Sequence, residues 1–293
     1  MKVISMFFLI TYALSAGFIF NVPAVSAQEV GDTVLMGKYH YDKDGTEKPI
    51  EWIVLNKKSN GTVFLLTKYA IELKSYHNKR DPVTWADCSL RKWLNEEFFD
   101  TAFDADEQDS IKVTEVTNNP NPVYGTQGGM DTRDRIFLLS IAQAGKYLDS
   151  GKTGIEKLTI LNPFSKVDEA RVVKMTPYVS EKFDKRFPGA SRKRNNQASS
   201  WLLRTVGNTQ LAIANVIEGG SISALGSWID LEYTSIRPAL WAELTDYVKI
   251  KIGSMGKYDV WGSEKYNMKK ESRKADTEME KSGRKSSEEF IFS

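Results

Sequence analysis

The chain has 293 residues, aromatic residues make up 11% of it, and its formal net charge at neutral pH is +2. So balanced a charge gives no general attraction to nucleic acid or to anionic membranes, which argues against proteins that bind these polymers through charge. Cys88 is the only cysteine. An intramolecular disulfide is therefore excluded, and the folded part depends on an apolar core rich in aromatic side chains.

Residues 1–27 have the pattern of a cleavable secretory signal peptide. Lys2 precedes an apolar run from Val3 to Phe20, and Val25-Ser26-Ala27 supplies the small residues that a signal peptidase requires. A retained membrane anchor is the alternative, because about 20 apolar residues span a bilayer, but Pro23 and the small-residue ending favour cleavage. We therefore expect a secreted or extracellular-surface protein with no stable membrane insertion after signal removal.

The composition divides the remaining chain into a globular part and a tail. Residues 28–252 alternate apolar and polar segments and predict a single globular α+β domain. Residues 253–293 form a charged tail, and its part from Gly262 onward is poor in apolar residues and rich in Lys, Arg, Asp and Glu. Such a segment buries too little apolar surface to order itself, so we predict that the tail is disordered.

The first predicted elements are strands. Gly31 to Tyr39 and Ile50 to Leu55 are short β-type runs with an Asp44-Gly45 turn between them. Asn60-Gly61 is a strong hairpin signal, because both residues tolerate positive φ, and Val63 to Thr67 is the returning strand. The opening of the domain is therefore predicted to be a β-meander.

Helix start signals follow the meander. Asp87 is predicted to cap a helix whose apolar face carries Leu90, Trp93, Leu94 and Phe98. Capping boxes and a first-turn proline predict three further helices, at Asp104 with Glu107, at Ser140 with Gln143, and at Thr176-Pro177.

The last third of the domain returns to strands. The predicted strands are Trp201 to Arg204, Ala212 to Ile217, Ser221 to Leu225 and Ile236 to Trp241, with a further extension over Tyr247 to Ile252. The pattern of strands, then helices, then strands is typical of the α+β class.

A series of short motifs resembles an uncharacterised domain of unknown function found in many exported proteins of Gram-positive bacteria. The motifs are Gly31-Asp32-Thr33, Pro49 to Leu55, Leu65 to Ala70, Cys88 to Asn95, Asp131 to Ser140, Trp201 to Arg204 and Ile236 to Trp241. That family is in turn similar to C-type-lectin-like and formylglycine-generating-enzyme-like folds. This second resemblance implies a C-type-lectin-like fold: a twisted antiparallel sheet with flanking helices and a long loop layer.

The residues offer little for catalysis. A formylglycine-generating-type oxidase needs two thiols, whereas this chain has only Cys88, which is better interpreted as a small buried hydrophobe. His40 and His77 are the only histidines, and no Gly-x-Ser-x-Gly nucleophile elbow is present. No short-spaced set of His, Cys and acidic residues indicates zinc. We therefore predict no catalytic residues, no metal and no cofactor.

Calcium is the harder metal to exclude from the sequence. Asn118-Asn119-Pro120-Asn121, together with Asp131 and Asp134, supplies the clustered oxygen atoms that hard cations prefer. Asx-rich turns also close loops for local reasons, and we favour that interpretation of this segment. A basic loop over Ser191 to Asn196 is interpreted as a solvated loop, because the aromatic residues that stack nucleic-acid bases are missing nearby.

Four residues are the candidate ligand-binding set: Trp201, Arg204, Trp228 and Arg237. The two arginines stand among apolar residues, so each guanidinium must be paired or hydrogen-bonded inside the protein. In the structural interpretation they bond backbone carbonyls or acids such as Asp131. In the functional interpretation one of them reaches a groove and, with Trp201 or Trp228, holds a polar ligand.

The leading functional hypothesis is therefore a secreted or surface-associated binding module that holds a glycan or a protein in its loop layer. Two alternatives stay open. One is an enzyme of unfamiliar type acting on cell-wall material, and the other is a non-catalytic structural protein whose charged tail mediates assembly.

Overall fold

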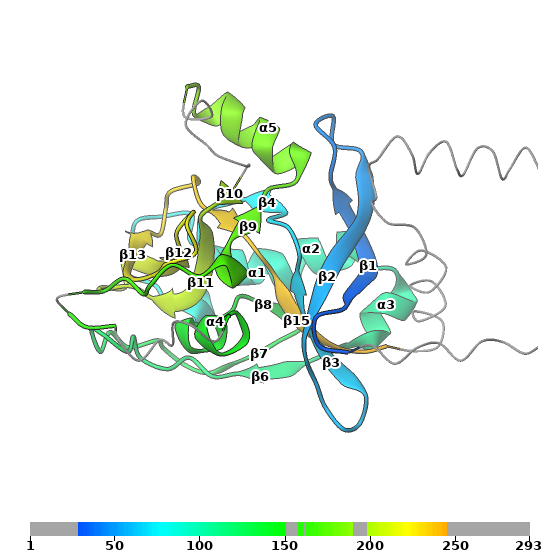
Figure 1. The fold of residues 1–293 in the computed structure, drawn as a ribbon, viewed down its shortest axis with the longest axis horizontal. Coiled ribbons are helices and arrows are strands. Elements are labelled where there is room, and N and C mark those ends of the chain that lie inside the picture. Colours follow the sequence, from blue (N-terminus) through cyan, green and yellow to red (C-terminus); the bar gives the residue numbers. More distant parts are fainter. Residues whose placement is uncertain (1–28, 151–157, 161, 190–197, 245–293) are drawn as a thin grey trace, which may run out of the picture.

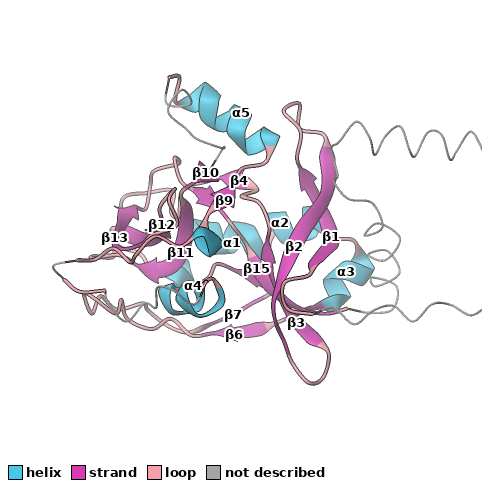
Figure 2. Ribbon diagram, in the orientation of Figure 1, coloured by secondary structure: helices cyan, strands magenta, loops and turns pink. Residues whose placement is uncertain are grey.

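The computed structural model describes residues 29–150, 158–160, 162–189 and 198–244 (Figure 1). The predicted signal peptide, the tail, the basic loop over Ser191 to Asn196 and the extension over Tyr247 to Ile252 lie outside these residues. Within the part that is described, the chain forms a mixed α+β fold built on curled sheets, as the α+β class predicts (Figure 2). The pairing of its strands is antiparallel except between β11 (Trp201–Val206) and β14 (Ser235–Ile236), which are parallel.

The predicted β-meander is confirmed and forms one half of the first sheet. Its strands are β1 (Thr33–His40), β2 (Glu47–Lys57) and β3 (Thr62–Thr67). The other half comes from distant segments: β15 (Ala239–Glu243) pairs with β3 and also with β5 (Ile111–Lys112) and β8 (Ile136–Phe137). All pairings in this sheet are antiparallel.

The second sheet carries the late strands. Its order is β13 (Ile222–Trp228), β12 (Ala212–Val216), β11 (Trp201–Val206), β14 (Ser235–Ile236) and β4 (Glu72–Leu73). The predicted strands of this region are therefore present, but the segment expected as one strand over Ile236 to Trp241 is divided at Arg237-Pro238. Its first part, β14, belongs to the second sheet, and its second part, β15, belongs to the first. Proline cannot donate to a sheet ladder, which accounts for the break.

Short helices pack around the sheets. They are α1 (Ser89–Asn95), α2 (Glu97–Ala102), α3 (Ala105–Ser110), α4 (Ile141–Tyr147) and α5 (Pro177–Arg186), with 3-10 turns at Trp85–Asp87 and Glu169–Arg171. Both predicted capping boxes are formed, and Thr176 caps α5. Within the described residues every helix is too short and too polar to cross a bilayer.

The single helix predicted from Asp87 to Phe98 is wrong, because the structure has a 3-10 turn and two short helices there. Asp87 ends a 3-10 turn, and Cys88 caps α1 by accepting from the Arg91 backbone N–H through its sulfur. The chain breaks at Glu96, so Phe98 belongs to α2. Asn95 ends α1 because its side-chain amide bonds the backbone of the β8 region, donating to the Ile136 carbonyl at 2.8 Å.

Two small ribbons complete the fold. β9 (Val173–Lys174) pairs with β10 (Ala198–Ser199), and β6 (Thr114–Val116) pairs with β7 (Thr132–Asp134). The β6–β7 ribbon closes the base of residues 117–131, which we call the Asx loop. Figure 1 shows that this ribbon lies on the same side of the molecule as α4.

Candidate functional site

A cavity of about 240 Å³ lies between the Asx loop, the start of α4 and β11. It is lined by Thr117, Asn118, Asn119, Pro120, Pro122, Gly128, Ser140, Ile141, Ala142, Arg204 and Thr205. Arg204 is the only formally charged residue in this lining. The volume of the cavity is slightly below the roughly 300–1,000 Å³ of ordinary ligand pockets, so the cavity suits a small ligand or one ring of a larger ligand.

Arg204 reaches the cavity from β11 and is 6% exposed. Its Nη1 donates to the Leu138 carbonyl at 2.8 Å and to the Gln143 side-chain carbonyl. Its Nη2 donates to the Thr117 carbonyl at 3.0 Å. The guanidinium therefore ties together β11, the start of α4 and the Asx loop, as the structural interpretation expects. Burial lowers the pKa of Arg204 to about 10, so the side chain still carries its charge at neutral pH.

Two buried polar atoms of the lining have no hydrogen-bond partner. They are the Nε of Arg204, which is a donor, and the Oδ1 of Asn118, which is an acceptor. Asn118 is 9% exposed, and its Nδ2 donates to the Met130 carbonyl at 2.8 Å. An unpartnered buried polar group costs about 1–3 kcal/mol, so both atoms call for a partner, a water molecule or a ligand, beyond the described protein groups.

The cavity wall also carries two hydroxyl groups, those of Ser140 and Thr205. The Ser140 oxygen accepts from the Gln143 N–H at 3.1 Å, and the Thr205 oxygen accepts from the Ile141 N–H at 3.0 Å. Each oxygen accepts one bond, and each hydroxyl also carries an O–H that is able to donate. The wall also carries apolar groups from Pro120, Pro122 and Ile141.

Asn121 anchors the Asx loop to the second sheet. Its Nδ2 donates to the carbonyls of Val206, Gly207 and Ala224, and its Oδ1 accepts from the Val123 and Tyr124 N–H groups. This buried side chain bonds backbone groups of two strands and of its own loop. The hydrogen bonds of Asn121 therefore hold the Asx loop, and with it the cavity wall, against the second sheet.

The two aspartates of the cluster that suggested calcium are bonded to protein groups. Asp131 accepts from the Asn118 N–H, and Asp134 accepts from Trp85 Nε1, Arg91 Nε and the Thr132 hydroxyl. Within the described residues no group of three or more His, Cys, Asp and Glu side chains is placed to hold a metal ion. These contacts fit the interpretation that the Asx residues build the loop.

The four candidate residues do not form one site, because only Trp201 and Arg237 lie together and they are in the core. Trp201 is fully buried, and its Nε1 donates to the Arg171 carbonyl at 2.9 Å. Arg237 is 2% exposed, lies 5.3 Å from the Trp201 ring, and donates to the Thr67 carbonyl at 2.7 Å. These two lie in the packed core, so we leave them out of the site that we propose below.

Trp228 has the opposite environment. It is 50% exposed at the end of β13, with the Arg80 guanidinium 5.1 Å from its ring. Arg80 is itself held by Asp230, because its Nε lies 3.0 Å from both carboxylate oxygens. Trp228 is therefore a surface aromatic residue with a positioned polar neighbour, outside the cavity lining.

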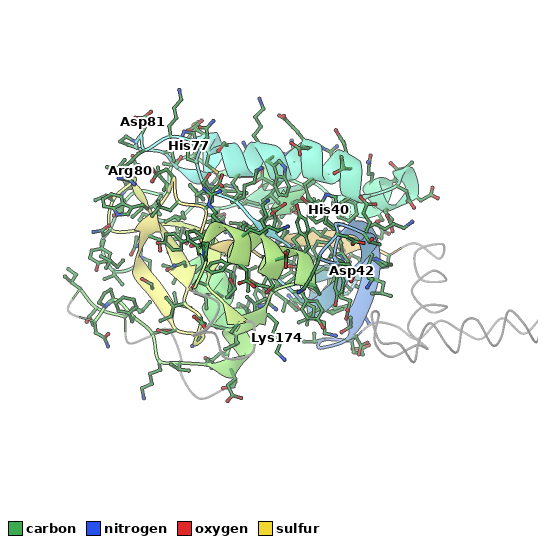
Figure 3. The ribbon with its side chains drawn as sticks, turned by 90° about the horizontal axis from the view of Figure 1, so that it is seen from above. His40, Asp42, His77, Arg80, Asp81 and Lys174 are labelled. Atoms are coloured by element: carbon green, nitrogen blue, oxygen red, sulfur yellow. The ribbon has the colours of Figure 1, made fainter. Side chains whose placement is uncertain are left out.

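The residues considered for catalysis lie apart. Cys88 is buried, and burial raises the pKa of its thiol to about 12, which keeps it protonated at neutral pH. His77 lies with Arg80 and Asp81 at one end of the molecule, whereas His40 lies with Asp42 beside α5 at the other (Figure 3). A recess beside His40 has a volume of only about 20 Å³. Such a volume holds about one water molecule.

The sequence singled out Arg204 but missed its cavity partners. Asn118 was noticed for its oxygen atoms, and Ser140 for its capping box, yet no local pattern indicates that both face Arg204. Thr205 follows Arg204 directly along β11, and adjacent residues of a regular strand face opposite sides. The bulge in the pairing of β11 with β12, between Leu202 and Val206, alters that alternation.

The fold and the site together define an α+β domain with a small cavity beneath a long loop. The chain belongs to the family described as a domain of unknown function, DUF6273, whose model matches residues 60–244. The resemblance to an uncharacterised domain is thus confirmed. No curated protein and no solved structure matches the chain.

Proposed function

We propose that this protein is an exported binding module that holds a glycan in the cavity beside Arg204. The observation that carries the proposal is the cavity itself, with a buried cation, an unpartnered donor on Arg204 and an unpartnered acceptor on Asn118. A glycan offers both hydroxyl donors and oxygen acceptors at short spacing. Binding one therefore satisfies both atoms, which a purely apolar ligand does not.

The lining fits a sugar ring in other respects. Pro120, Pro122 and Ile141 provide apolar surface for the C–H face of a ring, and the Ser140 and Thr205 hydroxyls provide donors at its edge. Pockets for small molecules generally combine an apolar wall with a few placed polar groups. The curled sheets with a long loop on one side also support the proposal of a C-type-lectin-like fold.

Trp228 supplies a second contact for a longer glycan in this proposal. An exposed tryptophan presents a large apolar ring with a polar tip, which suits binding surfaces. Arg80 and Asp230 place polar groups beside that ring. The Asx loop and the segment before β12 are joined by a bond from the Thr126 hydroxyl to the Asn208 carbonyl, and Asn208 in turn donates to Leu225 on β13. This chain of contacts links the cavity wall to the strand that carries Trp228.

Export remains part of the proposal and is supported by the signal-peptide pattern of residues 1–27. Its test is the N-terminal sequence and location of the protein in a bacterium that expresses it. A mature chain beginning at Gln28 outside the cytoplasm supports export, and an uncleaved cytoplasmic chain overturns it.

The test of glycan binding uses the purified protein on an array of bacterial cell-wall and capsular polysaccharide fragments. We expect binding that is lost in Arg204→Met and kept in Arg186→Met, a matched control on α5 whose arginine pairs with Glu232. Thermal unfolding of both variants shows that they are folded. Binding that persists in folded Arg204→Met overturns the cavity as the site, and no binding to any glycan overturns the proposed function.

A further inference from the structure

We infer that the cavity selects a sugar that carries a carboxylate, with Arg204 bonding the carboxylate and Asn118 accepting from a neighbouring hydroxyl. This inference rests on the proposed glycan binding and names the chemical class of the glycan. Three features of the cavity support it: its positive charge, the unpartnered hydrogen-bonding atoms of its lining and its volume.

The charge of the cavity is positive and uncompensated by its own lining. No Asp or Glu is among the residues that line it. Asp131 and Asp134 lie close enough to favour the charged form of Arg204, but within the described residues Arg204 forms no salt bridge. Asp134 is instead paired with Arg91 at 2.6 Å. A buried cation without an ion pair is expensive, and a ligand carboxylate removes that cost more fully than a neutral group.

The Arg204 guanidinium has N–H donors left over that a carboxylate is able to bond. A guanidinium has five N–H donors. Nη1 makes two of the bonds described above and Nη2 makes one. Among the described residues the Nε has no partner, and Nη2 carries a second N–H besides the one that bonds Thr117. A carboxylate accepts two such bonds at once, which is the strongest form of arginine recognition. The Nε and the Asn118 Oδ1 are both shielded from water in the unliganded protein, so this binding mode requires a local rearrangement of the cavity lining.

The Asn118 side chain defines the other half of the ligand. Its Nδ2 is held by the Met130 carbonyl, so the Oδ1 is left as an acceptor without a donor. A carboxylate alone has no hydrogen to offer to this oxygen, whereas a sugar hydroxyl does. The unpartnered donor and the unpartnered acceptor therefore call for one molecule that carries both a carboxylate and hydroxyl groups.

The size of the cavity narrows the choice to a single ring. A volume of about 240 Å³ is too small for a folded peptide segment or an oligosaccharide, and the longer chain must continue outside. A hexuronate, which is a sugar ring with a carboxylate at its sixth carbon, meets all three requirements.

The experiment compares glucuronate with glucose, because the two differ at one carbon. Isothermal titration or NMR titration of the full chain is expected to show glucuronate binding about tenfold more tightly than glucose, because only glucuronate offers a charged acceptor to Arg204. Arg204→Gln should reduce the affinity for glucuronate more than the affinity for glucose, so that the preference for glucuronate falls by at least that factor. Arg186→Gln is the matched control and should change neither.

Asn118→Asp is a second variant, which keeps the size of the side chain and adds a negative charge. It should weaken the binding of glucuronate more than the binding of glucose, because the introduced carboxylate and the carboxylate of glucuronate repel each other. Equal affinity for glucuronate and glucose overturns the inference but leaves the proposed glycan binding in place. If neither sugar nor any polysaccharide fragment binds, the proposed function fails as well. Preference for glucuronate that survives in folded Arg204→Gln also overturns the inference.

Discussion

Arg204 and Arg237 are both buried beside the second sheet, yet their surroundings give them different roles. Both donate to backbone carbonyls, and each has one guanidinium nitrogen without a partner. Burial lowers the pKa of Arg237 to about 9 and that of Arg204 to about 10. The difference is the space around them. Arg237 lies against the ring of Trp201 in the core, whereas Arg204 lines a cavity.

This comparison shows that a buried, incompletely bonded arginine does not by itself indicate a binding site. Arg237 joins the two sheets, because its Nε bonds the Thr67 carbonyl at the end of β3 while its own position follows β14. Arg204 joins the same sheet to a loop, and loops leave gaps where strands do not. The predictions below test whether this division between a structural and a ligand-binding arginine holds.

The largest effect is expected for Arg237→Ala. Removing a side chain of this size from the core leaves a cavity against Trp201, so the free energy of unfolding should fall by about 2–5 kcal/mol in urea denaturation. Arg237→Met is the matched control and should cost less, because it keeps the volume and removes the buried charge. If Arg237→Ala keeps wild-type stability but loses glycan binding, the division between the two arginines is wrong.

An intermediate effect is expected for Asn121→Ala. The substitution leaves the Val206 and Ala224 carbonyls without their donor, so the free energy of unfolding should fall by about 1–3 kcal/mol. Glycan binding should weaken in addition, because the cavity wall loses its anchor. Asn119→Ala serves as the stability control, since Asn119 is exposed in the same loop. Equal stability of the two variants would show that the loop is held by other contacts.

The smallest effect on stability is expected for Trp228→Ala. Trp228 is half exposed and its ring contacts Arg80, so the free energy of unfolding should change by about 1 kcal/mol or less. Binding of a single sugar should stay unchanged, whereas binding of a longer glycan should weaken. By contrast, Trp201→Ala should lower the free energy of unfolding by about 3–5 kcal/mol, because Trp201 is fully buried. Unchanged binding of long glycans in Trp228→Ala would remove this residue from the proposed surface.

Much of the local structure was predictable. The meander, the capping boxes at Asp104 and Ser140, and the start of α5 at Thr176 all depend on residues within a few positions of one another. The site was predictable only in part. Arg204 stood out as a charge among apolar residues, but the same pattern singled out Arg237, which the structure places in the core.

The sequence by itself determined the α+β class, the opening meander, the capped helix starts at Asp104, Ser140 and Thr176, and the need for each buried arginine to find a partner. These follow from short-range sterics, capping and desolvation. Only the tertiary structure decided where β15 crosses between the sheets and which arginine meets a cavity. Those outcomes depend on segments such as the Asx loop and α4 that approach Arg204 from distant parts of the chain. No local pattern records which backbone carbonyls will lie beside a guanidinium once the chain has folded.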